Sequence, residues 1–216
     1  MRWCCCGCLI LALLLFLGLA GVTLFAAMPL PSSVGTLGRP RDLGVRWTPA
    51  DYQSVYQKTH VEHSAPELHC LTCPTTYSGK QPVGDRFTDC EISAWLSTQN
   101  AKHGPLRDVQ VRFNADGTGE LSGLLVEQVN TPVYAKGRLT RASARAVSFG
   151  FEAISVGPVP LPQPIVQRAG EAVSGIVNDE LDRIDGLEIQ DLRIEAGGLV
   201  FKGTLPQAAR GSAPGR

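Results

Sequence analysis

The sequence predicts an α+β fold in which a curved antiparallel sheet packs on one long amphipathic helix, preceded by an N-terminal transmembrane helix. Three patterns lead to this prediction. Residues 9–28 form an uncharged apolar run, apolar and polar residues alternate between residues 109 and 153, and apolar residues recur at helical spacing between residues 165 and 184. These patterns are typical of a membrane span, of half-buried strands and of an amphipathic helix, respectively.

The apolar run is twenty residues long, from Leu9 to Met28. A helix rises about 1.5 Å per residue, so this run covers the roughly 30 Å hydrocarbon core of a bilayer. A cleaved signal peptide has a shorter apolar core and a small-residue cleavage site, for which the sequence Leu24–Pro29 is a poor match. We therefore expect residues 1–28 to be an uncleaved anchor, with a cleaved signal as the alternative.

The charges around the run give conflicting signals about its orientation. Arg2 precedes the run, whereas Arg39, Arg41 and Arg46 follow it, so the positive-inside rule alone places the C-terminal part in the cytoplasm. The leading segment is too short to be a translocated domain, and a single anchor usually exports a large C-terminal domain. We expect a single-pass membrane protein with an extracytoplasmic C-terminal domain.

Composition divides the remaining chain into a linker, one domain and a tail. Residues 29–47 are rich in Pro, Gly and Ser and lack apolar periodicity, which is typical of a linker. Residues 48–206 can form one domain with its own core, and we expect the polar residues 207–216 to be disordered. The chain has 20 basic and 20 acidic residues, so its charge gives no reason to expect nucleic-acid binding.

Two short helices are expected ahead of the strands. Thr48, Pro49 and Asp51 form a helix start, and this helix reaches about Thr59. Thr88 and Glu91 have the spacing of a capping box, so a second helix covers about residues 89–99. Residues 60–84, between the two helices, are polar and show no periodicity.

Antiparallel strands follow the second helix. Residues 109–113 and 120–128 flank a turn, and residues 133–140 and 147–153 alternate, with Ala153 on the apolar side. Four prolines exclude a helix or a central strand in residues 156–164.

The long amphipathic helix covers residues 165–184 and stops before Gly186. A hairpin of residues 187–195 and 199–205 closes the domain. Apolar alternation changes phase within its first strand, which predicts a bulge near Gln190 and Asp191.

This order of elements includes a strand that runs into Val156-Gly-Pro-Val-Pro-Leu-Pro162, the long helix, and the terminal hairpin Leu192–Thr204. It resembles bacterial envelope proteins of unknown function and, at a greater distance, the LmeA-like phospholipid-binding family. The similarity covers about residues 88–205. The resemblance implies a curved sheet wrapped on a long helix, related to the tubular lipid-binding folds, with an apolar groove for acyl chains. Its motifs are structural and include no catalytic signature.

Such a groove would be lined by apolar residues of the strands, the proline segment, the long helix and the final strand. The expected lining is Phe149, Phe151, Ile154, Leu161, Val166, Val173 and Phe201. The proline segment would form the mouth. The same residues are equally consistent with a filled core, because most apolar stripes pack against other parts of the protein.

A second group of residues has side chains that can bind metals or form disulfides. It consists of His60, His63, His69, Cys70, Cys73 and Cys90. A structural zinc site needs a second paired half-site, which Cys90 alone does not supply. In an exported domain a disulfide among the three cysteines is favoured, and free thiols, a metal site and a thioredoxin-like motif remain alternatives.

We therefore expect a membrane-anchored extracytoplasmic domain that binds an apolar ligand, a lipid, without catalysis and without a cofactor. One alternative is an envelope structural or assembly protein with a solid core and a protein partner. Another is a thiol or zinc module built on residues 60–90. The sequence contains no Gly-x-Ser-x-Gly, His-Glu-x-x-His or P-loop motif.

Overall fold

The computed structural model describes residues 39–64, 75–103, 106–126 and 130–211. This part of the chain contains three helices and eleven strands. In chain order they are α2 (Pro49–Thr59), β1 (Glu62–Ser64), β2 (Thr75–Ser78), β3 (Gln81–Thr88), α3 (Asp89–His103), β4 (Leu106–Phe113), β5 (Gly119–Leu125), β6 (Thr131–Arg141), β7 (Val147–Val156), β8 (Val159–Pro160), α4 (Gln163–Leu181), β9 (Glu188–Glu195), β10 (Gly198–Leu205) and β11 (Ala208–Gly211).

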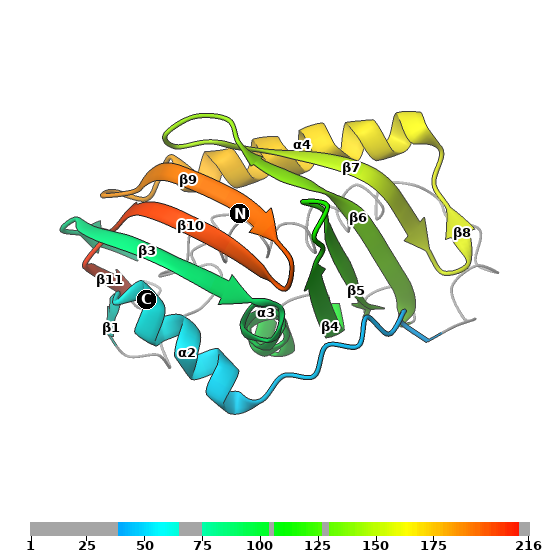
Figure 1. The fold of residues 1–216 in the computed structure, drawn as a ribbon, viewed down its shortest axis with the longest axis horizontal. Helices are drawn as coiled ribbons and strands as arrows, with labels where there is room; N and C mark the ends of the chain where they lie inside the picture. The colour runs from blue at the N-terminus through cyan, green and yellow to red at the C-terminus, as the bar shows by residue number, and fades with distance from the viewer. Residues whose placement is uncertain (1–38, 65–74, 104–105, 127–129, 212–216) are drawn as a thin grey trace, which may run out of the picture.

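The strands form three sheets. The largest has the order β4-β5-β6-β7-β8, with all neighbours antiparallel, and the second has the antiparallel order β3-β10-β9. Figure 1 shows the large sheet curving through one half of the molecule and the second sheet in the other half. Arg141 Nε, at the end of β6, donates to Ile189 O of β9 at 2.8 Å, which joins the two sheets. The small third sheet has the order β1-β11-β2.

Several local predictions are confirmed. Thr88 N donates to Glu91 Oε2 at 2.8 Å and Glu91 N donates to Thr88 Oγ1 at 3.2 Å, which is the reciprocal geometry of a capping box. In the terminal hairpin, Lys202 pairs with Asp191 and Gly203 with Ile189. Gln190 is therefore the extra residue of the predicted bulge.

The predicted α+β fold class is confirmed. The finer prediction, a single curved sheet packed on one long helix, does not describe the whole domain. The two expected short helices are present as α2 and α3. The strands are divided between more than one sheet, and the described parts of residues 60–84, expected to be irregular, contain β1, β2 and half of β3. In β3, Val83 and Phe87 face the core. Asp85 occupies the position between them on the same side of the strand, so the apolar alternation is interrupted and the strand is hidden in the sequence.

A bulge also changes the expected orientation of residues in β7. Lys136 pairs with Ala153, but the next residue, Gly137, pairs with Phe151, so Glu152 is an extra residue. Beyond this bulge the alternation shifts by one position. Ala153 is consequently exposed, contrary to the prediction, while Ile154 is buried.

The predicted linker and tail are both shorter than expected. Leu43 and Val45 are buried, with 4% and 7% of their surfaces exposed, and their backbone amides donate to Gln110 Oε1 at 2.9 and 3.4 Å. At the other end of the chain, Ala208–Gly211 forms β11 between β1 and β2, with Ala209 fully buried. Isolated apolar residues in polar segments carry no periodic signal, which explains why both contacts were missed.

The expected membrane anchor, residues 1–28, lies outside the described residues. Within the described ranges, none of the helices has both the length and the apolar character needed to cross a bilayer.

The helix α4 has the amphipathic character that the sequence predicted. Its buried residues are Val166, Ala169, Gly170, Val173, Val177 and Leu181. Figure 1 shows this helix running along β7. The helix ends at Leu181, three residues earlier than expected, and Ile184 is buried in the turn that follows.

Candidate functional site

The concave face of the large sheet contains a row of residues with an unusual composition. Strand pairing aligns Phe113 with Gly119, Gly119 with Gly137, and Gly137 with Phe151. This row therefore crosses four strands with an aromatic ring at each end and no side chain in the middle. The result is a hollow in the sheet between two aromatic walls.

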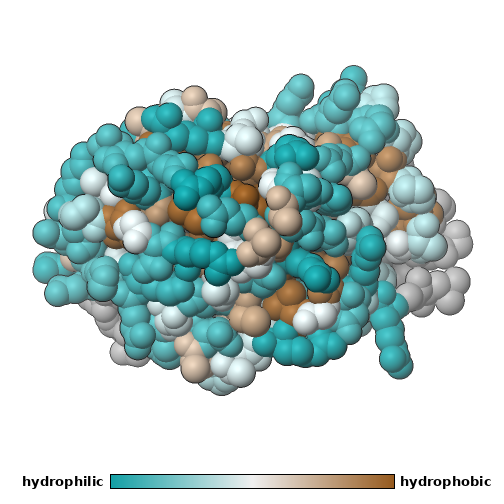
Figure 2. Space-filling view, in the orientation of Figure 1, coloured by the Kyte–Doolittle hydropathy of each residue, from teal (hydrophilic) through white to brown (hydrophobic). Residues whose placement is uncertain are grey.

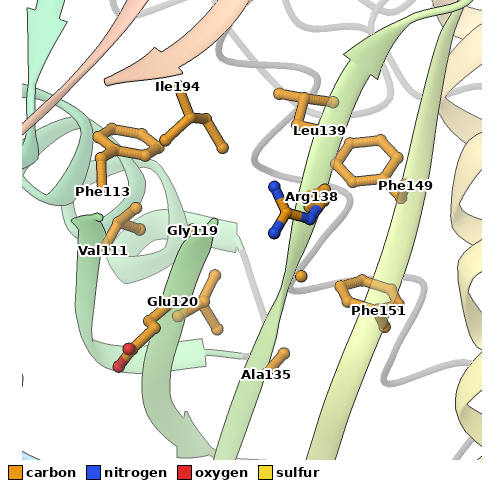
Figure 3. Close-up of a pocket in the computed structure, with 12 residues that line it drawn as sticks. Val111, Phe113, Gly119, Glu120, Ala135, Arg138, Leu139, Phe149, Phe151 and Ile194 are labelled. Carbon is orange, nitrogen blue, oxygen red and sulfur yellow. The ribbon is translucent and has the colours of Figure 1, made fainter. Parts of the chain in front are cut away.

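The neighbouring rows of the sheet are apolar as well. Leu139 pairs with Phe149 on one side of the hollow, and Leu121 pairs with Ala135 on the other. Ile194 reaches the hollow from β9, since a Cβ atom built on Gly119 would lie 3.5 Å from Ile194 Cδ1. In Figure 3, Phe113 and Ile194 lie on one side of the opening, and Leu139, Phe149 and Phe151 lie on the other.

These residues enclose a cleft that is open on one side. Its lining comprises Val111, Phe113, Gly119, Glu120, Leu121, Ala135, Gly137, Arg138, Leu139, Phe149, Phe151 and Ile194. Its free volume is about 30 Å³, which holds no more than a few water molecules. Ala135, Phe151 and Ile194 are partly buried, and Figure 2 shows apolar surface between the two sheets. An alkyl chain therefore fits only if the cleft widens.

The seven residues predicted to line a groove are divided among three places. Phe149 and Phe151 line the cleft, with stacked rings whose centroids are 6.3 Å apart. Val173 and Phe201 are fully buried in the main core. Ile154 and Val166 belong to a second buried cluster, completed by Val156 and Ala169 and packed against the half-buried Leu161. Of the seven residues, the structure thus brings only Phe149 and Phe151 together in the cleft.

Sequence reasoning missed several lining residues, among them Phe113, Gly119, Gly137 and Ile194. Their strands were predicted, but the hollow depends on how the strands are paired. A glycine in one strand is unremarkable until the register places it beside a glycine in the next strand. The signal that could have revealed the hollow is the presence of small residues in two adjacent predicted strands.

Both charged residues of the lining form hydrogen bonds or ion pairs with neighbouring residues. Glu120 Oε1 accepts from Asn114 Nδ2 at 3.1 Å. Arg138 Nη1 donates to Asp116 O at 2.8 Å, and its Nε lies 3.3 Å from Glu152 Oε1. Hydrogen bonds from Thr118 hold the pKa of Asp116 below its ordinary value, so this rim group is ionised at neutral pH. The rim is thus a closed polar network around an apolar centre.

The predicted thiol site is only partly within the described residues. His69, Cys70 and Cys73 lie outside them, and the side chain of His63 is not described. Cys90, the one predicted disulfide cysteine among the described residues, carries a free thiol there. Its Sγ donates to Arg46 O at 3.3 Å. Within the described part of the chain, no group of three His, Cys, Asp or Glu residues could hold a metal ion.

A wider hollow lies over the outer face of the second sheet. It has a volume of about 830 Å³ and includes the basic residues Arg86, Arg193 and Lys202 in its lining. Arg193 is paired with Asp191 and with Glu195, the latter at 2.9 Å. This surface is therefore broad, polar and of mixed charge, unlike the apolar cleft.

Comparison with known proteins gives no relative for this chain: no protein family, no curated protein and no solved structure matches it significantly.

Proposed function

We propose that this chain is a membrane-tethered, extracytoplasmic module that binds the apolar part of a lipid-like ligand in the cleft, without catalysis. The observation that carries the proposal is the row Phe113, Gly119, Gly137 and Phe151, which leaves an apolar hollow in an otherwise filled core. Covering such surface contributes roughly 25 cal/mol per Å² of apolar area removed from water. An apolar ligand is the partner that gains most from this surface.

Ile194 controls the size of the cleft in this proposal. It is partly buried and lies at ordinary contact distance from the position that a Cβ on Gly119 would occupy. Movement of this one side chain opens the hollow toward solvent. The hairpin turn beside it is held in place, because Gly197 N donates to Phe113 O at 2.9 Å. Ligand uptake thus needs a side-chain change rather than separation of the sheets.

The polar groups of the rim are better suited to binding a ligand than to catalysing a reaction. Glu120 and Arg138 are held by Asn114, Asp116 and Glu152 and leave the centre of the cleft to carbon atoms. Binding of this kind agrees with the resemblance to phospholipid-binding proteins, which implies an apolar groove. The same resemblance implies that the ligand is a membrane lipid.

A second candidate function uses the hollow over β3, β10 and β9. Its mixed charges and its width are typical of a surface that contacts another protein, since interface rims are polar and solvent-accessible. In this alternative the chain is an envelope assembly protein, and the cleft is a packing defect of the core.

A phospholipid with a photoreactive group at the end of its acyl chain tests the first candidate. The full chain is reconstituted in vesicles that contain this lipid, irradiated and digested, and the modified peptides are identified by mass spectrometry. Binding in the cleft gives adducts on peptides from β4 to β7, in addition to those on residues 1–28. Adducts confined to residues 1–28 would contradict the proposal and favour the protein-binding alternative.

A further inference from the structure

Two of the three exposed large apolar residues in the described part of the chain lie at one end of the large sheet. Val126 is 38% exposed and Val159 is 44% exposed, and the third, Trp47, lies elsewhere near the start of α2. Val126 directly follows Leu125, which pairs with Thr131 at the beginning of β6. The turn before Val159 reaches the same place, because Gly157 N donates to Pro132 O at 2.7 Å. We call Val126 and residues 158–160 the β8 tip.

The chain arrives from its N-terminal segment at this same end. The guanidinium of Arg41 lies 4.6 Å from the ring centroid of Tyr134. Tyr134 pairs with Ser155, and Ser155 pairs with Pro160 of the tip. Figure 1 shows the segment that begins at residue 39 starting near β8 and β6. Beyond it, Leu43 and Val45 are buried, so the point of arrival is fixed to the domain.

The length of the preceding segment limits how far the tip can lie from the apolar run. Ten residues, 29–38, separate Met28 from Arg39. Fully extended, they span at most roughly 33–36 Å. A run that crosses a bilayer therefore keeps residue 39, and with it the β8 tip beside the start of the described chain, within roughly 36 Å of the membrane surface.

The backbone of the tip is suited to an apolar surrounding. Pro158, Pro160 and Pro162 have no N–H groups, and Leu161 N donates to Ile154 O at 2.9 Å. Gly157 N is also satisfied, through Pro132 O. Unpaired backbone donors are what makes an irregular segment costly at a membrane, and this segment has few of them.

An apolar path connects the tip with the cleft. The second buried cluster lies between them, and the half-buried side chains packed against it are Val133, Ala135, Phe151 and Leu161. Ala135 and Phe151 also line the cleft. Figure 2 shows apolar surface at the end of the molecule where β8 lies.

We infer that the β8 tip rests in the bilayer interface, with Val126 and Val159 among the lipid headgroups. The inference rests on the membrane anchor of the proposed function. It adds the orientation of the domain on the membrane.

A photoreactive side chain at the tip tests this orientation. Val159 is replaced by p-benzoyl-phenylalanine in the full chain, which is reconstituted in phospholipid vesicles and irradiated. The matched control carries the same residue in place of Lys202, which is exposed on the other sheet. Alkaline extraction of the vesicles shows separately whether the chain is anchored.

The expected result is a chain that resists alkaline extraction and forms lipid adducts several-fold more often from position 159 than from position 202. Equal adduct formation from the two positions, or none from position 159 in an anchored chain, would overturn the inference. Release of the chain by alkali would show that the chain has no membrane anchor, and this would also overturn the inference. Ligand binding in the cleft is decided independently, by the acyl-chain adducts on β4 to β7.

Discussion

Asn178 of α4 makes both of the backbone hydrogen bonds that a neighbouring strand would make with Val147. Its Oδ1 accepts from Val147 N at 2.9 Å and its Nδ2 donates to Val147 O at 3.1 Å. One turn earlier, Ser174 Oγ accepts from Phe149 N at 2.9 Å. The helix thus occupies the edge of β7 in place of a strand. An edge closed in this way is no longer a template for pairing with another chain.

The opposite edge of the sheet is closed by the same device. Ser93 of α3 accepts from Val111 N at 2.8 Å and donates to Val111 O at 3.3 Å. Ser97 Oγ donates to Val109 O at 3.0 Å, and Asp89 Oδ1 accepts from Phe113 N at 2.8 Å. These residues are spaced by four along α3 and so lie on one face of the helix. Both helices hold the curvature of the sheet on which the cleft depends.

Substitution of Asn178 by Ala is expected to lower the free energy of unfolding by about 1–3 kcal/mol, because it leaves two backbone groups of Val147 without partners. Urea unfolding of the full chain in mild detergent, followed by the fluorescence of the buried Trp95, measures this change. Asp179→Ala is the matched control, since Asp179 is exposed on the same helix and its loss shifts stability by less than about 0.5 kcal/mol. Equal midpoints for both variants would show that Asn178 does not seal the edge.

Two glycines of α4 are expected to respond to alanine in opposite directions. A Cβ on Gly170 would lie 2.6 Å from Phe149 O, so Gly170→Ala forces the helix away from β7 and destabilises the protein. A Cβ on Gly175 would meet nothing within 4 Å, so Gly175→Ala raises stability by up to about 1 kcal/mol through helix propensity. Thermal unfolding of the two variants checks the pair. A stability gain for Gly170→Ala would mean that helix and strand do not approach closely.

Glu91 is expected to make stability depend on pH in the acid range. Burial raises the pKa of this carboxyl, but hydrogen bonds from Lys58, Ser54 and Thr88 N outweigh it and lower the pKa below its ordinary value of 4.5. A carboxyl with a lower pKa in the folded state stabilises the fold when ionised. This contribution is complete above about pH 4.5 and is lost as the pH falls through the lowered pKa.

The variant Glu91→Gln isolates this effect from other titrating groups. Wild type is expected to be more stable than the variant at pH 7, and the difference should shrink as the pH is lowered from 5 to 3. Urea unfolding at a series of pH values measures the difference. A difference that stays constant from pH 7 to pH 3 would contradict the assigned role of Glu91.

Cys90 is expected to react slowly with alkylating reagents at neutral pH. Burial raises the pKa of its thiol, and the negative charge of Asp51 raises it further, so the reactive thiolate is scarce. Iodoacetamide labelling of the full chain, resolved by peptide mass spectrometry, gives the rate at this residue as a function of pH. Asp51→Asn should increase that rate. Fast labelling near pH 7 would show that the thiol is activated and would support the alternative of a thiol module.

Features with a local cause could be predicted from the sequence. The capping box of Thr88 and Glu91 involves residues three apart, and the bulge at Gln190 appears as a change of phase within one strand. The turn at Asn114 and Gly117 is of the same kind, with Gly117 in the left-handed region at φ 77°. Each signal is complete within a short stretch of chain.

Features that depend on pairing between distant segments could not be predicted in the same way. Strand β3 pairs with β10, more than a hundred residues later, and its apolar pattern is interrupted by Asp85. The cleft exists because the register places Gly119 beside Gly137. Ser93 and Asn178 are ordinary helix residues until the strand that each one contacts is known. Sequence therefore indicated the elements, while the site arose from their alignment.

The central claim, that the hollow at Gly119 receives an apolar ligand, is tested most directly by filling it. Gly119→Val places a side chain against Ile194 and Phe113, whereas Gly150→Val adds the same groups to β7, two strands away in the same sheet, where a Cβ meets nothing within 4 Å. The measurement is the yield of acyl-chain adducts on β4 to β7 in vesicles with the photoreactive phospholipid. We expect Gly119→Val to abolish most of this yield and Gly150→Val to leave it unchanged. Equal yields from wild type and both variants would contradict the claim that the cleft is the binding site.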